Sequence, residues 1–212
     1  MRPAVAAAAV LLAATAAAAA GPTREQALAG LGRTDVQARR DGAAALADVG
    51  TMADTGALVG ALRDPDTAVR ALAERGLWRI WTRAGDPEID GLMALGIEQM
   101  NTRQGEAAVD TFTRIIEKRP DFAEGWNKRA TVYYLLDQYE RSLADCDEVI
   151  KRNPQHFGAL SGYGMIYLEL GQPAKALAYF ERALAVNPNL ESVEAAVQSL
   201  KRLLIERRKG TI

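Results

Sequence analysis

The sequence is poor in the residues that most often carry chemistry, because its 212 positions hold one cysteine and one histidine. With Cys146 alone, no disulfide can form within the chain, so packing has to stabilise the fold. With His156 alone, the paired-histidine zinc motif of metalloproteases is excluded. We expect Cys146 to be a buried, inert thiol and His156 to be a solvated polar residue at the start of a helix.

Other motifs of catalysis and ligand binding are missing too. Gly30-Leu31-Gly32 lacks the third glycine of a phosphate-binding loop, and Ser161 lacks the glycine frame of hydrolases. The acidic residues between 86 and 188 do not follow the spacing of a calcium loop. A formal net charge of −1 supplies no field that would recruit nucleic acid. We therefore predict that the protein is not an enzyme and needs no cofactor or metal.

A short basic start precedes an uncharged, alanine-rich stretch at the N-terminus. Met1-Arg2-Pro3 is followed by residues 4–20 without a charge, and Ala18 and Ala20 are the small residues of a cleavage site. This pattern predicts a secretory signal peptide over residues 1–20, export to the periplasm of a Gram-negative-type bacterium, and no membrane span in the mature chain. The alternative is an uncleaved N-terminal anchor, although the stretch is short and weakly apolar for a span.

Aromatic residues make up only 6% of the chain, and alanine supplies much of the 49% that is hydrophobic. This composition favours helices over strands. Helix stops recur at a constant interval, since Pro87, Pro120, Pro154 and Pro188 lie 33, 34 and 34 residues apart. A repeat of this length is typical of stacked helical hairpins.

Residues at equivalent positions between these prolines agree from one repeat to the next. The matching residues are Leu92, Leu95, Gly96, Ala108, Phe112 and Ile115, then Trp126, Ala130, Tyr133, Leu143, Cys146 and Val149, then Leu160, Gly164, Tyr167, Ala176, Phe180 and Ala183. Over Ile89 to Pro188 the chain resembles the tetratricopeptide repeat family. The resemblance implies an all-α, right-handed superhelix (solenoid), with three hairpins in residues 86–188.

The residues also predict how each hairpin is made. Small residues at Gly96, Ala130 and Gly164 let the two helices approach closely, beside bulky residues such as Phe112 and Phe180. The turns between paired helices are expected at Gly105, Asp137 and Gly171. The second hairpin departs most from the family pattern, with Arg129, Ser142 and Cys146 where apolar or small residues are usual.

The segments on either side of the hairpins are expected to be helical as well. Residues 189–212 continue with apolar residues at helical spacing and should form a capping helix. Residues 21–85 repeat with a period of 31 and resemble the HEAT-like repeat, with Asp64-Pro65-Asp66 capping a helix start. Trp78 and Trp81 are expected to seal the junction with the first tetratricopeptide hairpin.

The resemblance implies that the first helix of each hairpin lines a concave groove. The predicted partner-binding residues are Met93, Ile97, Met100, Asn127, Lys128, Thr131, Tyr134, Ser161, Met165 and Leu168. Some family members clamp a peptide's terminal carboxylate with basic and asparagine residues here, but this chain has Met93, Ile97, Gly158 and Gly162 at those positions. We therefore expect an apolar or amphipathic segment as the ligand, unless the C-terminal helix covers the groove.

These features predict a non-catalytic protein–protein interaction module or scaffold of the bacterial cell envelope. Its partner would be another protein or a peptide segment, and no nucleic acid is expected. Two alternatives stay open: a periplasmic chaperone-like factor that holds unfolded clients, and an accessory subunit of an envelope enzyme complex.

Overall fold

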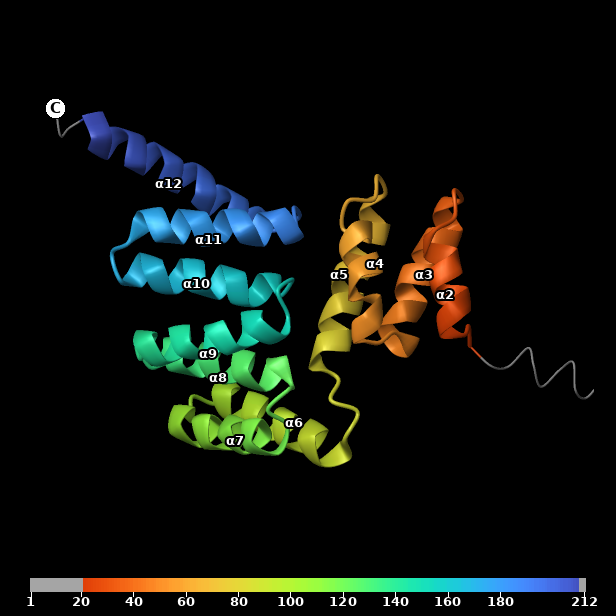
Figure 1. Ribbon diagram of the computed structural model, residues 1–212, viewed down its shortest axis with the longest axis horizontal. Coiled ribbons are helices and arrows are strands. Elements are labelled where there is room, and N and C mark those ends of the chain that lie inside the picture. The colour runs from red at the N-terminus through yellow and green to blue at the C-terminus, as the bar shows by residue number, and fades with distance from the viewer. Residues whose placement is uncertain (1–20, 210–212) are drawn as a thin grey trace, which may run out of the picture. The chain divides into compact units, whose positions relative to one another are not determined.

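The computed structural model describes residues 21–209. The predicted signal peptide at 1–20 lies outside the described residues, as do residues 210–212. Every regular element from residue 21 to residue 209 is a helix, which confirms the all-α fold class (Figure 1). Within that range, no helix combines the length and the apolar character that crossing a bilayer requires.

The chain divides into two compact units, and the boundary between Gly76 and Leu77 falls inside helix α5 (Thr67–Thr82). The predicted boundary lay later, at residue 86. The first unit contains α2 (Arg24–Leu31), α3 (Val36–Val49), the 3-10 helix η1 (Met52–Asp54), α4 (Thr55–Ala61) and most of α5.

Aspartates begin two of the helices in the first unit. Asp35 accepts a hydrogen bond from the backbone N–H of Ala38 at 2.7 Å and so caps α3. Asp66 accepts one from Val69 at 3.0 Å and caps α5, as predicted. Asp64 does not cap the helix directly, because its carboxylate accepts from the backbone N–H of Asp66 at 2.9 Å. It stabilises the turn before the helix instead.

Helices α2 and α3 touch at a glycine. A Cβ added to Gly42 would lie 2.5 Å from the backbone nitrogen of Leu31, so no larger residue fits at this crossing. Between the two halves of the unit, Arg39 forms an ion pair with Asp64 at 2.7 Å, and both side chains are largely buried. The HEAT-like character of this unit stays a prediction.

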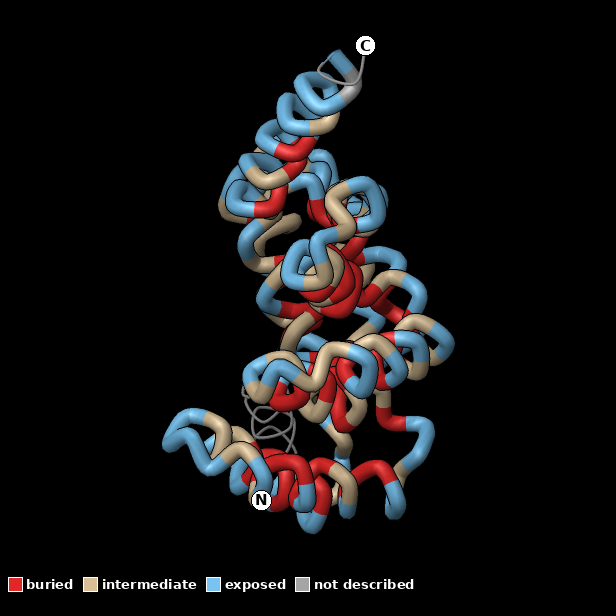
Figure 2. Tube along the Cα trace, turned by 90° about the vertical axis from the view of Figure 1, so that its left-hand side faces the viewer, coloured by how far each residue is buried: buried red, intermediate tan, exposed pale blue. Residues whose placement is uncertain are grey.

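The second unit begins with the last turns of α5 and continues as antiparallel hairpins. Its further helices are α6 (Pro87–Asn101), α7 (Gly105–Lys118), α8 (Ala123–Leu135), α9 (Tyr139–Arg152), α10 (Phe157–Glu169), α11 (Pro173–Val186) and α12 (Glu191–Lys209). Helix α6 pairs with α7, α8 with α9, and α10 with α11, where the proline period predicts three hairpins. Figure 2 shows that the buried residues of each helix are interrupted by exposed ones, as expected of amphipathic helices.

The turns inside the hairpins use the left-handed backbone region. Asp137 and Gly171 adopt φ values of 56° and 67°, as predicted for these two turns. In the first hairpin the prediction was wrong, because Arg103 takes the positive φ of 59° and Gly105 is already the first residue of α7. Gly105 is small for a packing reason: a Cβ there would come within 2.8 Å of a methyl group of Leu136.

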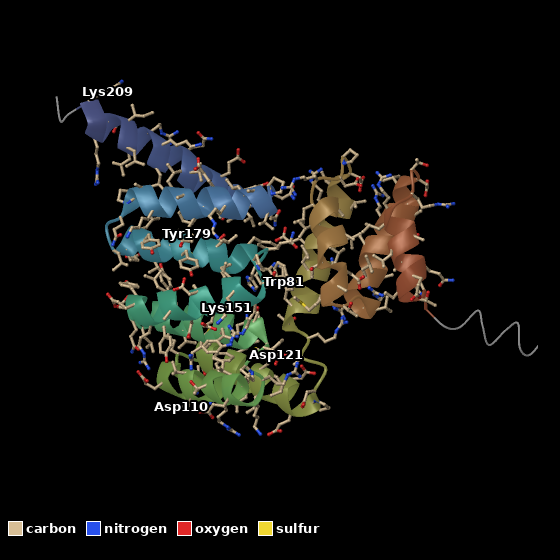
Figure 3. All side chains as sticks on the ribbon, in the orientation of Figure 1. Trp81, Asp110, Asp121, Lys151, Tyr179 and Lys209 are labelled. Atoms are coloured by element: carbon tan, nitrogen blue, oxygen red, sulfur yellow. The ribbon has the colours of Figure 1, made fainter. Side chains whose placement is uncertain are left out.

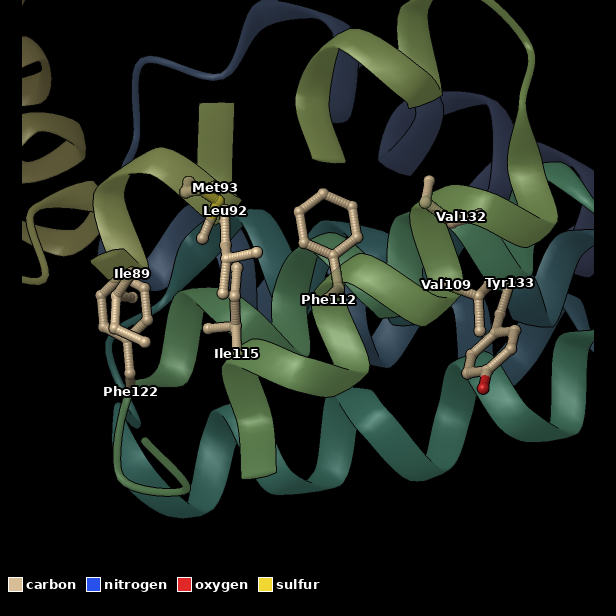
Figure 4. Close-up of a cluster of buried hydrophobic side chains, with 10 residues drawn as sticks. Ile89, Leu92, Met93, Val109, Phe112, Ile115, Phe122, Val132 and Tyr133 are labelled. Atoms are coloured by element: carbon tan, nitrogen blue, oxygen red, sulfur yellow. The ribbon is translucent and has the colours of Figure 1, made fainter. Parts of the chain in front are cut away.

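The paired helices approach at small residues, as the repeat pattern predicts. A Cβ added to Gly96 would lie 2.5 Å from the ring of Phe112, and Gly164 is in the same relation to Phe180. Figure 4 shows the core that results around Phe112, which is fully buried. The side chains of this core are Ile89, Leu92, Met93, Ala108, Val109, Phe112, Ile115, Phe122, Val132 and Tyr133.

The polar residues that set the second hairpin apart are paired with one another or with the backbone. Arg129 forms a two-pronged ion pair with Asp145, with both N–O distances at 2.8 Å. The hydroxyl of the buried Ser142 donates to the backbone oxygen of Ala130 at 2.7 Å. These contacts satisfy groups that would otherwise be costly to bury, so the hairpin keeps its shape without the usual apolar residues.

Helix α12 packs on α11 with one face only. Val193, Val197 and Leu200 are buried, whereas Glu194 and Gln198 on the other side are exposed. A polar outer face lets a helical array end in water, and the capping role of this helix stays a prediction.

Candidate functional site: a pocket between the second and third hairpins

A pocket of about 170 Å³ opens between the first helices of the second and third hairpins, α8 and α10. Its lining residues are Asn127, Ala130, Thr131 and Tyr134 from α8, Ser142 and Cys146 from α9, and Gly158, Ala159, Ser161, Gly162, Met165 and Ile166 from α10. A benzene-sized group fits a cavity of roughly this volume, whereas drug-sized ligands need about 300 Å³ or more. The pocket therefore suits one apolar side chain.

The pocket exists because the second hairpin lacks an aromatic ring. Cys146 stands at the position that Phe112 and Phe180 fill in the other two hairpins. The space is kept open from α10 as well, since a Cβ added to Gly162 would meet only the sulfur of Cys146, at 3.8 Å. Two small residues facing each other thus leave the room that a phenylalanine ring occupies elsewhere.

The polar atoms at the pocket wall are already bonded within the protein. The hydroxyl of Thr131 donates to the backbone oxygen of Asn127 at 2.9 Å, and that of Ser161 donates to Phe157 at 2.9 Å. Cys146 is 2% exposed, and burial raises the pKa of its thiol to about 12. The thiol is therefore protonated near neutral pH and is no nucleophile.

A buried charged cluster lies at one end of the groove. The carboxylate of Glu124 accepts hydrogen bonds from the Nε2 of His156 and the Nζ of Lys128, both at 3.0 Å, and from Asn127 at 3.2 Å. The Nδ1 of His156 accepts from the backbone N–H of Ala159 at 3.1 Å, which places the imidazole proton on Nε2. Burial opposes the charged form of Glu124. The bond from His156 and the charge of Lys128 outweigh it and hold the carboxyl pKa below its usual value.

This cluster corrects two expectations. His156 is not solvated but fully buried, because it caps α10 and reaches back to Glu124. Lys128 does not line the pocket, because its ammonium group points to the same carboxylate. His156 links the third hairpin to the second through Glu124, whereas Lys128 and Glu124 pair within α8.

The two tryptophans contact the third hairpin, so their predicted place beside the first was wrong. Trp81, labelled in Figure 3, stacks on His156 with ring centroids 4.6 Å apart. Trp78 meets Phe157 edge to face at 5.2 Å. A Cβ added to Gly158 would come within 2.6 Å of the Trp78 ring. The last turns of α5 thus close the groove at its Gly158 end.

Five of the ten predicted groove residues meet in this pocket. These are Asn127, Thr131, Tyr134, Ser161 and Met165. Met93 does not reach the surface, because it is 5% exposed in the core of the first hairpin. Ile97 packs against the same core, and Leu168 is exposed beside the pocket without lining it. Met100 lines a separate hollow of about 250 Å³ with Leu135 and Leu136.

The sequence pattern had not assigned the floor of the pocket. Ser142 and Cys146 depart from the repeat pattern, but the pattern alone does not indicate that their small side chains leave an open space. No group of three or more histidine, cysteine, aspartate or glutamate side chains in the described range could hold a metal ion.

Comparisons with known proteins agree with this architecture. The family model described as tetratricopeptide repeat matches residues 121–189, which span the second and third hairpins. A TPR repeat-containing protein of Rhizobium etli is 33% identical over 146 residues, which cover 69% of this chain and 71% of that protein. Anaphase-promoting complex subunit 3 of Schizosaccharomyces pombe is 30% identical over 87 residues, 41% of this chain but 13% of its own length.

Solved structures with low sequence identity share the fold. The Sgt2 TPR domain from Aspergillus fumigatus superposes with a TM-score of 0.56 at 21% identity, covering 60% of this chain and 85% of that one. The first TPR of Spaghetti (RPAP3), bound to the HSP90 peptide SRMEEVD, gives a TM-score of 0.53 at 20% identity, covering 55% and 93%.

Proposed function

Because this chain belongs to the tetratricopeptide repeat family, we propose that it is a non-catalytic interaction module that binds a segment of another protein in the groove between α8 and α10. The observation that carries the proposal is the pocket at Cys146. It is open to the groove, it is sized for one apolar side chain, and its wall hydroxyls are bonded to helix carbonyls. An inserted apolar side chain would leave none of these groups unsatisfied.

The chemistry of the groove favours an apolar anchor over a terminal carboxylate. The solved relative described above is bound to the acidic peptide SRMEEVD. In this chain the groove lysine, Lys128, is engaged by Glu124. A peptide carboxylate at this place would compete with a buried internal carboxylate for the same ammonium group, which disfavours such a ligand.

We also propose that the protein acts in the bacterial cell envelope as a scaffold. The proposal is supported by residues 1–20, whose basic start, uncharged alanine-rich stretch and Ala18-x-Ala20 site have the pattern of a signal peptide. The test is N-terminal sequencing of the protein recovered from a periplasmic fraction. A mature chain that begins at Gly21 is expected, and an intact Met1 on soluble cytoplasmic protein would contradict export.

The groove itself is tested with a variant that fills the pocket. Gly162→Leu places a side chain at the pocket, and its Cβ has ordinary van der Waals contact with the Cys146 sulfur at 3.8 Å. Gly56→Leu on α4 is the matched control, because nothing lies within 4 Å of an added Cβ there. Both variants replace a helical glycine by leucine, which favours the helix by about 1 kcal/mol.

Affinity capture from an envelope extract compares the wild type with these two variants. We expect a small set of proteins that the wild type and Gly56→Leu recover and Gly162→Leu does not. Equal recovery by all three would contradict binding in the pocket. Capture of denatured chains without preference for a native partner would favour the chaperone-like alternative instead.

A further inference from the structure

The pocket continues into a patch of tyrosines and carboxylates at the C-terminal ends of α8 and α10. Tyr134 lines the pocket, and its ring lies 6.0 Å from that of Tyr139, centroid to centroid. The Tyr134 hydroxyl donates to Glu169 at 3.4 Å, and the Tyr139 hydroxyl donates to Asp137 at 2.8 Å. We call these four residues the acidic tyrosine patch.

The two carboxylates of the patch have no cationic partner. Within residues 21–209, neither Asp137 nor Glu169 forms an ion pair with a lysine, arginine or histidine. Their charge raises the pKa of both phenols. Burial and Glu169 raise that of Tyr134, and the hydrogen bond to Asp137 raises that of Tyr139 to about 12. The acidic tyrosine patch therefore has a negative electrostatic potential and lies next to the apolar pocket.

The first helices of the hairpins, which the structure describes in full, add no unpaired positive charge, and Arg141 of α9 is directed to the Tyr133 ring and the side chain of Gln138. Helices α6 and α10 carry acidic residues and no lysine or arginine. The two cations of α8 are engaged internally, Lys128 by Glu124 and Arg129 by Asp145.

Resting on the proposed groove function, we infer that the bound segment carries a lysine or arginine close to its apolar anchor, and that this cation docks on the acidic tyrosine patch. Aromatic faces and carboxylates both attract an organic cation, and together they complement a basic side chain rather than an acidic one. A metal ion is a poorer occupant, because the described residues group no three carboxylate, histidine or cysteine ligands.

The probe is a displayed library of random nonapeptides, selected in parallel on three full-length proteins. These are the wild type, the double variant Asp137→Asn/Glu169→Gln, and Gly162→Leu. Asparagine suits position 137, because it tolerates the positive φ of that turn. The double variant removes both charges and keeps the size of both side chains.

On the wild type we expect peptides with an apolar residue and a lysine or arginine at a constant spacing from it. On the double variant the apolar residue should persist and the preference for a basic one should weaken. A selected peptide should bind the double variant about tenfold more weakly, since two exposed charge pairs are lost while both tyrosine rings stay. Replacing the peptide's basic residue by glutamine should cost more than this on the wild type, where the charge pairs and the cation–aromatic contact are lost together, and clearly less on the double variant.

The outcomes separate this inference from the proposed function. Enrichment of apolar residues without a basic preference, lost on Gly162→Leu, would overturn the inference and leave groove binding intact. A basic preference that is as strong on the double variant as on the wild type would also overturn it. If Gly162→Leu selects the same peptides as the wild type, the pocket is not the binding site, and the proposed function and the inference fail together.

Discussion

Placing a phenylalanine ring at position 146 is the most direct test of how the pocket arises. Cys146→Phe alone should place a ring against the Cβ of Ala130, whereas the other two hairpins have Gly96 and Gly164 at that position. An added Cβ on Gly96 would lie 2.5 Å from its phenylalanine, so the single variant should be overpacked and lose about 1–3 kcal/mol of unfolding free energy. Adding Ala130→Gly should relieve that clash.

The double variant Cys146→Phe/Ala130→Gly should be at least as stable as the wild type. A buried phenylalanine contributes about 1.5–3 kcal/mol, and a helical glycine in place of alanine costs about 1 kcal/mol. The expected order of stability is therefore double variant, wild type, single variant. The double variant should also lose the partners that the wild type recovers, because its pocket is full.

The assay is urea unfolding followed by tryptophan fluorescence. Trp78, Trp81 and Trp126 are all three of the chain's tryptophans and all lie in the second unit, so the signal reports the unit that holds the pocket. If the single variant is as stable as the double variant, the ring does not need the space beside residue 130. In that case the ring enters the pocket beside Ala130, and the predicted clash with the Ala130 Cβ is refuted.

Three further predictions use the same protein. Glu124→Gln should cost about 3 kcal/mol at neutral pH in the urea assay, because it breaks a buried charge cluster. Since the folded-state pKa of Glu124 is lowered, its stabilisation is present above the ordinary value of 4.5 and is lost as the pH falls through the folded value. The stability gap between wild type and variant should therefore narrow on acidification, and a constant gap would contradict the assignment. Cys146 should react with a thiol reagent far more slowly in the native protein than in the unfolded one, because it is buried and its pKa is raised to about 12; equally fast labelling of both, followed by absorbance, would refute this. Gly96→Ala should destabilise by about 1–3 kcal/mol through its clash with Phe112, whereas Gly91→Ala, with nothing within 4 Å, should stabilise slightly; melting curves of the two should shift in opposite directions.

The hairpins could be predicted from the sequence because their signals are local. Pro120, Pro154 and Pro188 follow helix ends as predicted, whereas Pro87 begins α6 and the predicted helix stop there was wrong. Small residues facing phenylalanine indicate close helix contact within a single hairpin. The positions of the paired helices followed from these signals. Turn chemistry was less certain, since Arg103 rather than Gly105 takes the left-handed conformation in the first hairpin.

The site was harder to predict because its residues are defined by neighbours distant in the chain. Nothing near His156 in sequence indicates that Trp81 covers one face of its ring and that Glu124 lies at its edge. From the sequence, Lys128 was predicted to line the groove, but in the structure it pairs with the buried carboxylate of Glu124. Met93 has the right register for the groove, but the packing of the first hairpin encloses it.

The missing ring at Cys146 also bears on how repeat arrays acquire distinct ligands. The three hairpins share one backbone plan, and the pocket opens where the second hairpin, which departs most from the shared pattern, meets the third. If the proposed function holds, a single change from a large to a small residue, at a position whose usual occupant only fills space, provides a recognition surface while the helices keep their places. In related arrays, a small residue at the register of Phe112 and Phe180 should therefore mark which repeat receives the partner. Such proteins would then differ in their ligands because one repeat lacks a side chain that the other repeats share.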